Sequence, residues 1–184
     1  EHLLYDGAVH KSVASFSQAH FEHTIIVHGF AKAWSMTGWR LGWCAAPEPI
    51  AKAIDAVQSH STSNPTSFAQ KGAVAALTGP QDHLPKWLAE FSQRRTYAFN
   101  QLNSMPGISC VNAQGAFYLF PNIAKTGLKS AEICAKLLEQ EKVAAVPGIA
   151  FGADDYIRLS YATSMANIEK GLARIGNFCQ SLKG

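Results

Sequence analysis

The stretch that most constrains the fold covers residues 29–42 and reads GFAKAWSMTGWRLG. It follows an apolar run at residues 24–28, whose β-branched side chains favour a buried strand. Lys32 stands among small and apolar neighbours, which predicts a partly desolvated amine able to condense with a carbonyl group. Arg40 follows eight residues later and adds a planar cation that suits a phosphate. Together they predict an amine nucleophile beside an anion clamp.

Each of the two residues alone has a simpler interpretation. A lone lysine is usually solvated, and a lone arginine usually forms a weak surface ion pair. The whole stretch, however, resembles the attachment motif for pyridoxal phosphate (PLP) in class I and II aminotransferases. That motif places small and apolar residues at fixed positions around the lysine, with a glycine before the arginine. The positions that match it here are Gly29, Phe30, Ala31, Lys32, Ser35, Met36, Gly38, Arg40, Leu41 and Gly42.

The resemblance implies roles for four residues of this stretch. Lys32 is expected to carry PLP covalently and to act as the catalytic acid and base. Arg40 is expected to bind the phosphate, while Gly29 and Ala31 allow the backbone to approach the cofactor closely. Some family members have a serine in place of Gly29 or Ala31. Phosphate binding in this chain is therefore expected to depend on Arg40 and on groups upstream of it.

A second part of the candidate site is Arg158, which stands mid-strand within the segment YIRLSY at residues 156–161. A cation in apolar surroundings is costly unless an anion meets it. That anion is either Asp154 or Asp155 in an ion pair, or the carboxylate of a substrate. The segment resembles the C-terminal part of the same family, whose arginine binds the α-carboxylate of the amino acid, and this favours the substrate. Residues 115–123 and 146–152 also resemble family segments near the substrate.

The composition excludes several other classes of protein. The 184 residues are 47% hydrophobic and 16% charged, and the net charge of +3 is not gathered into blocks. The chain thus shows no footprint for nucleic acid or an anionic membrane surface, and no apolar run approaches the roughly 20 residues of a membrane span. The four cysteines are scattered, and two fall on expected core faces. This predicts free thiols, a reducing compartment and a cytoplasmic location.

Hydrophobic periodicity predicts the elements that carry these motifs. Strands are expected at residues 24–28, 40–45, 108–111, 116–120, 143–146 and 156–160. Helices are expected from Pro47 onward and at residues 68–77, 82–103, 130–140 and 165–182.

Three polar features are interpreted as structural. Ser67 with Gln70 is expected to form a capping box. Arg94 and Arg95 are expected on a solvated helix face. His20 and His23 could both ligate a metal from one helical face, but they are expected to be exposed to solvent, so no metal site is predicted. Residues 16–21 are expected to form a loop and a short turn.

The resemblance covers nearly the whole chain and implies an α/β fold. Residues 1–96 are expected to end the large domain of PLP fold type I, which has a mostly parallel sheet in three α/β/α layers. Residues 97–184 are expected to form the small C-terminal α+β domain. The N-terminal segment EHLLYDG follows an Asp-x-x-Tyr motif in the family, which leads us to expect the C-terminal half of a longer enzyme.

The activity implied is that of a PLP-dependent aminotransferase in amino acid metabolism, and the subgroup most similar contains bacterial aspartate and prephenate aminotransferases. Such an enzyme moves an amino group between an L-amino acid of the aspartate, glutamate or aromatic type and a 2-oxo acid, usually as a homodimer. Two alternatives share the motifs. One is a PLP-dependent C–S lyase or synthase, and the other is the aminotransferase-like sensor domain of a transcription regulator. The motifs favour the aminotransferase.

Overall fold

The computed structural model describes residues 1–182, which form two compact units. Unit 2 consists of His2 and Val9–Leu84, whereas unit 1 consists of Glu1, Leu3–Ala8 and the chain from Pro85 onward. The sequence predicts a domain boundary between residues 96 and 97, and the chain passes between the units at residues 84 and 85. The assignment of the two units to a large and a small domain remains a prediction.

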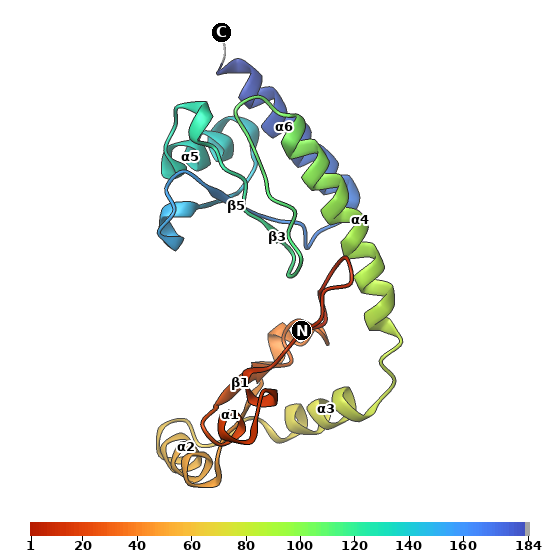
Figure 1. The fold of residues 1–184 in the computed structure, drawn as a ribbon, viewed down its shortest axis with the longest axis vertical. Helices are drawn as coiled ribbons and strands as arrows, with labels where there is room; N and C mark the ends of the chain where they lie inside the picture. The colour runs from red at the N-terminus through yellow and green to blue at the C-terminus, as the bar shows by residue number, and fades with distance from the viewer. Residues whose placement is uncertain (183–184) are drawn as a thin grey trace. The chain divides into compact units, whose positions relative to one another are not determined.

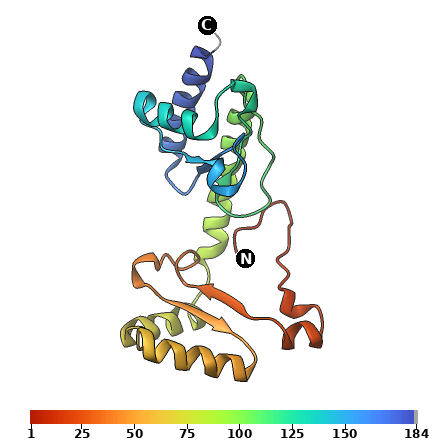
Figure 2. The same ribbon diagram turned by 90° about the vertical axis from the view of Figure 1, so that its left-hand side faces the viewer.

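Unit 2 is built around an antiparallel strand pair, β1 (Ile26–Gly29) and β2 (Gly42–Ala45), shown in Figure 2. β2 falls within the predicted range of residues 40–45, and β1 overlaps the predicted range of residues 24–28 but ends one residue later. Their register pairs Ile26 with Ala45 and Gly29 with Gly42, so residues 30–41 form the loop that joins them. The other elements of the unit are η1 (Val13–Ser15), α1 (Gln18–Glu22), η2 (Thr37–Trp39), α2 (Glu48–Ser61) and α3 (Ser67–Thr78).

The core of unit 2 is small. Phe30, Met36 and Ala73 are its buried residues, with Trp34 and Leu41 packed against them. By contrast, Val27 on β1 is 80% exposed, and all four residues of β2 are exposed. The joining loop is therefore fixed by packing against α3, while the strand pair itself is largely uncovered in this chain.

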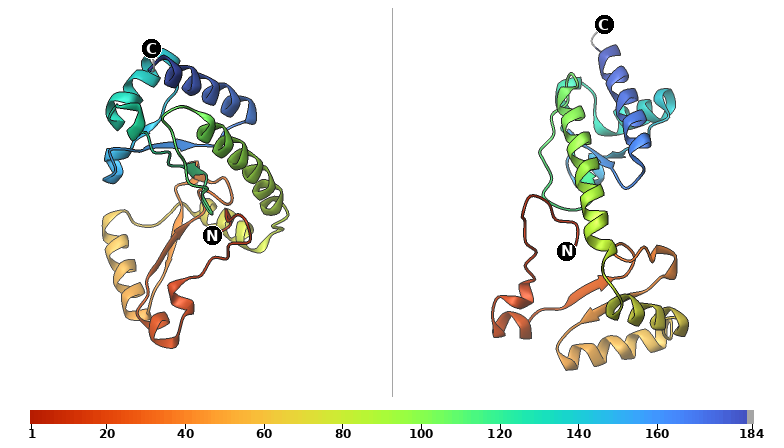
Figure 3. Two further views of the ribbon diagram at one scale, coloured as in Figure 1. Left: turned by 45° about the horizontal axis from the view of Figure 1, so that its top comes forward. Right: turned by 90° about the vertical axis from the view of Figure 1, so that its right-hand side faces the viewer.

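Unit 1 contains a three-stranded antiparallel sheet in the order β3-β5-β4. In Figure 1 the long helix α4 (His83–Ser104) lies beside the first residues of the chain, and Figure 3 shows it running unbroken along its length. The largest buried cluster of the chain belongs to this unit and includes Leu102, Leu119, Leu137, Ile157 and Ile175. The remaining elements are β3 (Tyr118–Leu119), η3 (Ala124–Thr126), α5 (Ser130–Glu141), β4 (Val146–Pro147), η4 (Gly148–Phe151), β5 (Ile157–Ser160) and α6 (Met165–Ser181).

Two of the predicted strands are corrected by the structure. At residues 108–111 only Ser109 forms an isolated bridge, to Asn122, because Val111 is 85% exposed and has nothing to pack on. Of the predicted strand at residues 143–146, only Val146 lies in a strand, namely β4. The first residue of the predicted strand instead closes α5, since the Val143 amide donates to the Leu137 carbonyl after the left-handed Lys142.

Two predictions of local structure are also wrong. Residues 18–22 form the short helix α1 rather than a loop, because the Ser17 side chain accepts a hydrogen bond from the His20 amide at its N-terminus. Ser67 is the first residue of α3 and the cap position is Thr66, so Ser67 cannot cap the helix. Gln70 donates instead to the Pro65 carbonyl oxygen at 2.8 Å.

Within residues 1–182 no helix combines the length and the apolar character needed to cross a membrane.

Candidate functional site

Lys32 lies on the loop between β1 and β2, in a turn whose two ends are buried. Phe30 is 3% exposed and Met36 is 6% exposed, and the Met36 amide donates to the Phe30 carbonyl oxygen at 3.4 Å. The Ser35 amide closes the turn by donating to the Lys32 carbonyl oxygen at 3.1 Å. The fold therefore fixes the backbone of Lys32 from both sides.

Two further contacts tie this turn to the connection between α3 and α4. The Trp34 indole donates to Gln81 Oε1 at 3.1 Å, and His83 Nε2 lies 3.0 Å from the Ala33 carbonyl oxygen. Gln81 is itself fixed, since its amide donates to the Ala76 and Gly79 carbonyl oxygens. The lysine backbone thus belongs to a rigid part of unit 2.

The side chain of Lys32 differs from the sequence expectation. It was predicted to be partly desolvated, but Lys32 is exposed in this chain. The small and apolar neighbours in the sequence pack on α3 through Phe30 and Met36, which leaves the lysine on the open side of the turn. Backbone placement is therefore provided by the 184 residues, whereas desolvation is not.

Arg40 ends the loop in a left-handed conformation, with φ 53° and ψ 45°. Ser35, earlier in the same loop, also has a positive φ of 52°. Such backbone is costly for residues with a side chain and occurs preferentially at functional sites. Arg40 is exposed and its Nη1 donates to the Thr37 carbonyl oxygen at 2.9 Å. Its other N–H groups meet no acceptor among residues 1–182.

The two glycines that face each other across β1 and β2 differ in what they require. A Cβ added to Gly42 would lie 2.9 Å from the His28 carbonyl oxygen, so the close pairing of the strands needs a glycine there. A Cβ added to Gly29 would lie 3.5 Å from the Leu41 carbonyl oxygen, an ordinary contact. Packing within the chain therefore does not require a glycine at position 29. Ala31 is half-buried in the turn before Lys32.

Arg158 lies on β5 in unit 1, and its guanidinium contacts two aromatic rings. Its Cζ is 4.4 Å from the centre of the Tyr118 ring and 4.7 Å from the centre of the Phe151 ring. Neither Asp154 nor Asp155, the two candidates from the sequence, forms an ion pair with Arg158. Asp154 accepts hydrogen bonds from Ser130, and Asp155 pairs with Lys129 at 3.1 Å. No carboxylate among the described residues meets this cation.

Sequence reasoning missed a buried cluster around Arg95. That residue was expected on a solvated face but is 2% exposed, and it donates to both carboxylate oxygens of Asp6 at 2.7 and 2.8 Å and to the Ala113 carbonyl oxygen at 2.7 Å. Its Cζ lies 4.4 Å from the centre of the Tyr5 ring. The one available signal was the Tyr5-Asp6 pair near the N-terminus, whose partner lies 89 residues away in the chain.

The charges in this cluster act on its titratable groups. The hydrogen bonds from Arg95 hold the pKa of Asp6 below its ordinary value of 3.8, and Asp6 raises the pKa of Arg95 in turn. Burial raises the pKa of Tyr5 and of Tyr161, whose hydroxyl groups lie 3.3 Å apart. The cluster is thus a closed, structural ion pair.

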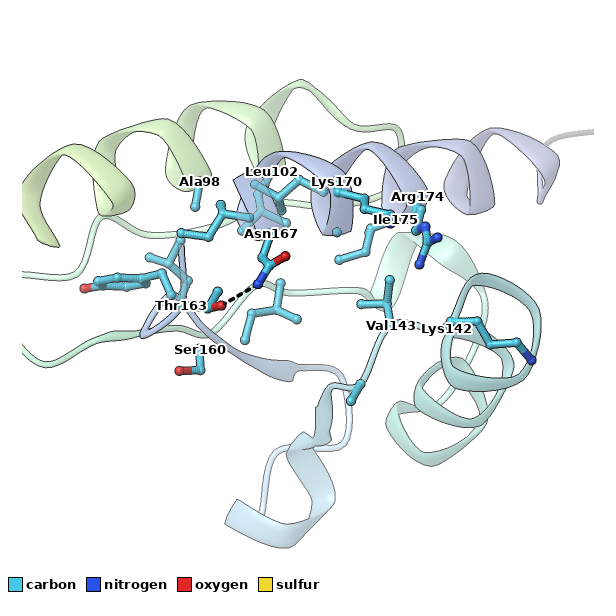
Figure 4. A pocket seen from close by; sticks show the side chains of 17 residues that line it. Ala98, Leu102, Lys142, Val143, Ser160, Thr163, Asn167, Lys170, Arg174 and Ile175 are labelled. Carbon is cyan, nitrogen blue, oxygen red and sulfur yellow. Dashed lines mark hydrogen bonds between the residues drawn. The ribbon is translucent and has the colours of Figure 1, made fainter. Parts of the chain in front are cut away.

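A cavity of about 360 Å³ in unit 1 lies among α4, β5, α6 and the end of α5 (Figure 4). It contains none of the site residues predicted from the sequence. Two of its cations already cap α5, because Lys142 Nζ donates to the Glu139 carbonyl oxygen at 2.7 Å and Arg174 Nη1 to that of Glu141 at 3.0 Å. Two of the three cations in the lining therefore serve the end of α5, and Lys170 is the third.

The two histidines near the N-terminus are exposed, as predicted. His20 Nδ1 lies 2.8 Å from Ser17 Oγ and His23 Nδ1 lies 2.8 Å from the Ala19 carbonyl oxygen, so both serve the short helix α1. Residues 1–182 contain no group of three or more His, Cys, Asp or Glu side chains suited to a metal ion.

Lys32, Arg40, Gly29 and Ala31 lie together on one hairpin of unit 2, whereas Arg158 lies in unit 1. The structure therefore gives the geometry of each half of the candidate site within its own unit.

The sequence matches a family model described as aminotransferase class I and II over residues 2–175. The aspartate aminotransferase of Geobacillus stearothermophilus is 47% identical over 98% of this chain and 47% of its own length. The aspartate/prephenate aminotransferase of Nitrosomonas europaea is 39% identical over 96% of this chain and 47% of its own length. The chain therefore spans about half the length of the curated relatives that it matches.

Solved structures give the same result. The aromatic aminotransferase from Pyrococcus horikoshii OT3 aligns with a TM-score of 0.95 and 38% identity, covering 100% of this chain and 50% of that one. The aspartate aminotransferase from Rhizobium meliloti aligns with a TM-score of 0.93 and 39% identity, covering 97% of this chain and 47% of the other.

Proposed function

The chain belongs to the aminotransferase class I and II family, with the PLP fold type I predicted from its sequence, and on this basis we propose that it is part of a PLP-dependent aminotransferase. The enzyme moves an amino group between an L-amino acid of the aspartate, glutamate or aromatic type and a 2-oxo acid. The names of the relatives support this reaction over C–S cleavage and over a sensor role.

The donor set of the loop at residues 30–41 fits PLP. This cofactor needs a primary amine for its aldehyde and a cation for its phosphate. Lys32 supplies the amine on a fixed turn, and Arg40 supplies a guanidinium that keeps N–H groups without an acceptor among the described residues. Gly29, whose small size the packing of the hairpin does not require, leaves space beside them.

When bound, PLP supplies an electron sink that stabilises negative charge at the substrate α-carbon. Lys32 would hold the cofactor covalently until the amino group of the substrate displaces it. Its freed Nζ would then take the proton that the α-carbon releases and later give it back. Arg40 anchors the phosphate. Arg158 binds the substrate α-carboxylate and so fixes the position of the reacting carbon.

The observation that carries the proposal is the environment of Arg158. A guanidinium that contacts two rings and meets no carboxylate in residues 1–182 has its hydrogen-bonding edge available for an external anion. Arginine binds carboxylates in a bidentate, planar arrangement, which is what orientation of an amino acid requires.

We also propose a homodimer and a cytoplasmic location. Unit 2 exposes many large apolar side chains, among them Val27 at 80%, Val57 at 69% and Phe68 at 69%. Exposed apolar surface of this kind is typical of protein interfaces. The four cysteines are free, as expected for a reducing compartment.

The test is the kinetics of amino transfer by the whole protein after Arg158→Gln. Loss of a bidentate charge-assisted pair should raise the KM for the amino acid by about 10- to 100-fold. Arg94→Gln is the matched control, because Arg94 pairs with Glu90 on the same helix at 2.7 Å and contacts no proposed site residue. An unchanged KM for Arg158→Gln, or no amino transfer by the wild type, would contradict the proposal.

A further inference from the structure

We propose that Tyr118 and Phe151 are positioning residues that orient Arg158 for its carboxylate ligand. The inference rests on the function proposed above for Arg158. It adds the means by which the cation is held in place before a substrate arrives.

The register of the sheet places Tyr118 against Arg158. Tyr118 pairs with Ser160 across β3 and β5, and Arg158 stands two residues before Ser160 on the same strand. Residues two apart on a strand share a face, so Tyr118 and Arg158 are diagonal neighbours. The 4.4 Å from Arg158 Cζ to the ring centre is a cation–π distance.

Phe151 reaches Arg158 from the opposite neighbouring strand. β4 pairs with β5 so that Val146 lies across from Arg158, and η4 follows β4 directly and ends at Phe151. Because β5 lies between β3 and β4, the two rings come from the two sides of the strand that carries the cation. The two rings therefore restrict the orientation of the Arg158 guanidinium from both sides of β5.

The position of Phe151 is fixed by tight packing of η4. A Cβ at Gly148 would overlap the carbonyl oxygens of Ala153 and Tyr156, so only glycine allows the turn to fold back as it does. The Gly148 amide donates to the Tyr156 carbonyl oxygen at 2.9 Å. The Phe151 ring also packs edge-on against Phe120 at 5.9 Å, and Phe120 stacks on Tyr156 at 5.0 Å.

The position of Tyr118 is fixed at the start of β3. The Ala116 carbonyl oxygen accepts two phenolic hydroxyl groups, from Tyr5 at 2.7 Å and from Tyr161 at 2.9 Å. Ala116 has a positive φ of 62°, a costly conformation that these bonds stabilise. The Tyr118 ring then packs on Phe117 with ring centres 4.4 Å apart.

Aromatic rings orient an arginine without occupying its hydrogen-bonding groups. The attraction acts between the cation and the face of the ring, whereas the five N–H donors point outward in the guanidinium plane. An aspartate would hold the side chain equally well, but it would neutralise the charge and compete with the substrate. The two nearby aspartates are kept away, Asp154 by Ser130 and Asp155 by Lys129. The cation is thus held and still available.

The experiment compares Phe151→Leu with Phe151→Trp in the whole protein. Leucine keeps apolar volume but removes the aromatic face, and tryptophan keeps the face. We expect Phe151→Leu to raise the KM for the amino acid about five- to tenfold with kcat within about twofold, and Phe151→Trp to stay near the wild type. Succinate is a dicarboxylate that does not react. Its dissociation constant, measured by calorimetry, should rise in Phe151→Leu and stay near the wild-type value in Phe151→Trp.

Phe91→Leu is the matched control. It removes a similar arginine contact, since Arg94 Cζ lies 5.3 Å from the Phe91 ring centre. The Phe91 ring lies 6.2 Å from the rings of Phe117 and Tyr161 and is not in contact with Arg158. Phe91→Leu should leave both the KM and the succinate constant unchanged. Phe151 is 49% exposed, so its variants should fold. If Phe151→Leu does not fold, Tyr118→Leu against Tyr118→Phe gives the same comparison.

The outcomes separate the two proposals. If Arg158→Gln raises the KM but leucine and tryptophan at position 151 behave alike, the positioning role is overturned and the function stands. If Arg158→Gln has no effect, the proposed function itself fails. A rise in KM confined to the non-aromatic variants supports the positioning role.

Discussion

Arg95 and Arg158 both lie against aromatic rings in unit 1, but they differ in whether a carboxylate of the chain neutralises their charge. Arg95 is buried and forms a bidentate pair with Asp6, so its charge is neutralised within the chain. Arg158 contacts rings alone and meets no carboxylate among the described residues. We therefore interpret Arg95 as structural and Arg158 as a binding residue, although the sequence predicts a solvated position for Arg95.

The structural role of Arg95 predicts a loss of stability in Arg95→Met. The change removes three hydrogen bonds and leaves the Ala113 carbonyl oxygen without this donor. The free energy of unfolding should fall by about 1–3 kcal/mol in urea titrations. Arg94→Met, which breaks an i,i+4 pair with an exposed Glu90 and a contact with the Phe91 ring, should cost less than about 1 kcal/mol. An equal loss of unfolding free energy in Arg95→Met and Arg94→Met would contradict the structural role of Arg95.

Acid should reduce this difference between wild type and Arg95→Met. The pKa of Asp6 is lowered in the folded chain by its hydrogen bonds with Arg95. The pair therefore contributes its stability above the ordinary pKa of 3.8, and the contribution is lost as the pH falls through the lowered value. Unfolding curves of the two proteins should converge on acidification, whereas a constant gap would show that packing alone is responsible.

At the scale of elements, the hairpin of β1 and β2 offers a matched pair of glycines. Gly29→Ala should leave the stability of the hairpin unchanged or raise it by up to about 1 kcal/mol, because the added Cβ makes only ordinary contacts. Gly42→Ala should cost about 1–3 kcal/mol, because its Cβ would be 2.9 Å from a backbone oxygen that cannot move freely. Thermal unfolding measures both.

Cofactor retention gives these variants a second readout. If Gly29 is small in order to let the backbone approach PLP, Gly29→Ala should weaken PLP binding by about tenfold despite its unchanged stability. Unchanged PLP binding in a stable Gly29→Ala protein would remove Gly29 from the cofactor site.

The elements with long, periodic patterns were predictable from the sequence, and the short ones were not. The stripe of apolar residues in α4 and in α6 predicted both helices, since one face of each packs in the core of unit 1. The segment at residues 108–111 was interpreted as a strand because local alternation does not show whether a partner strand is present. Only Ser109 finds one, at Asn122.

At the scale of the whole molecule, the motif predicted which residues gather on one hairpin but not how they are covered. Lys32 and Arg40 lie on one loop because β1 and β2 pair with Gly29 opposite Gly42. Lys32 is exposed in this chain, which spans about half the length of the relatives.

The pairs between distant residues could not be predicted from the sequence for a similar reason. Nothing local to Arg95 shows that Asp6 will meet it, and nothing local to Arg158 shows that Asp154 and Asp155 will be held elsewhere by Ser130 and Lys129. Both outcomes depend on how distant segments of unit 1 pack.

The central claim is that Lys32 carries the cofactor, and the most direct test is covalent trapping with PLP. The whole protein and its Lys32→Ala variant are mixed with PLP, reduced with borohydride and digested for peptide mapping. We predict an absorption band in the near-visible range for the wild type, a reduced adduct on Lys32, and neither in the variant. An adduct on another lysine, or none on the whole protein, would contradict the account.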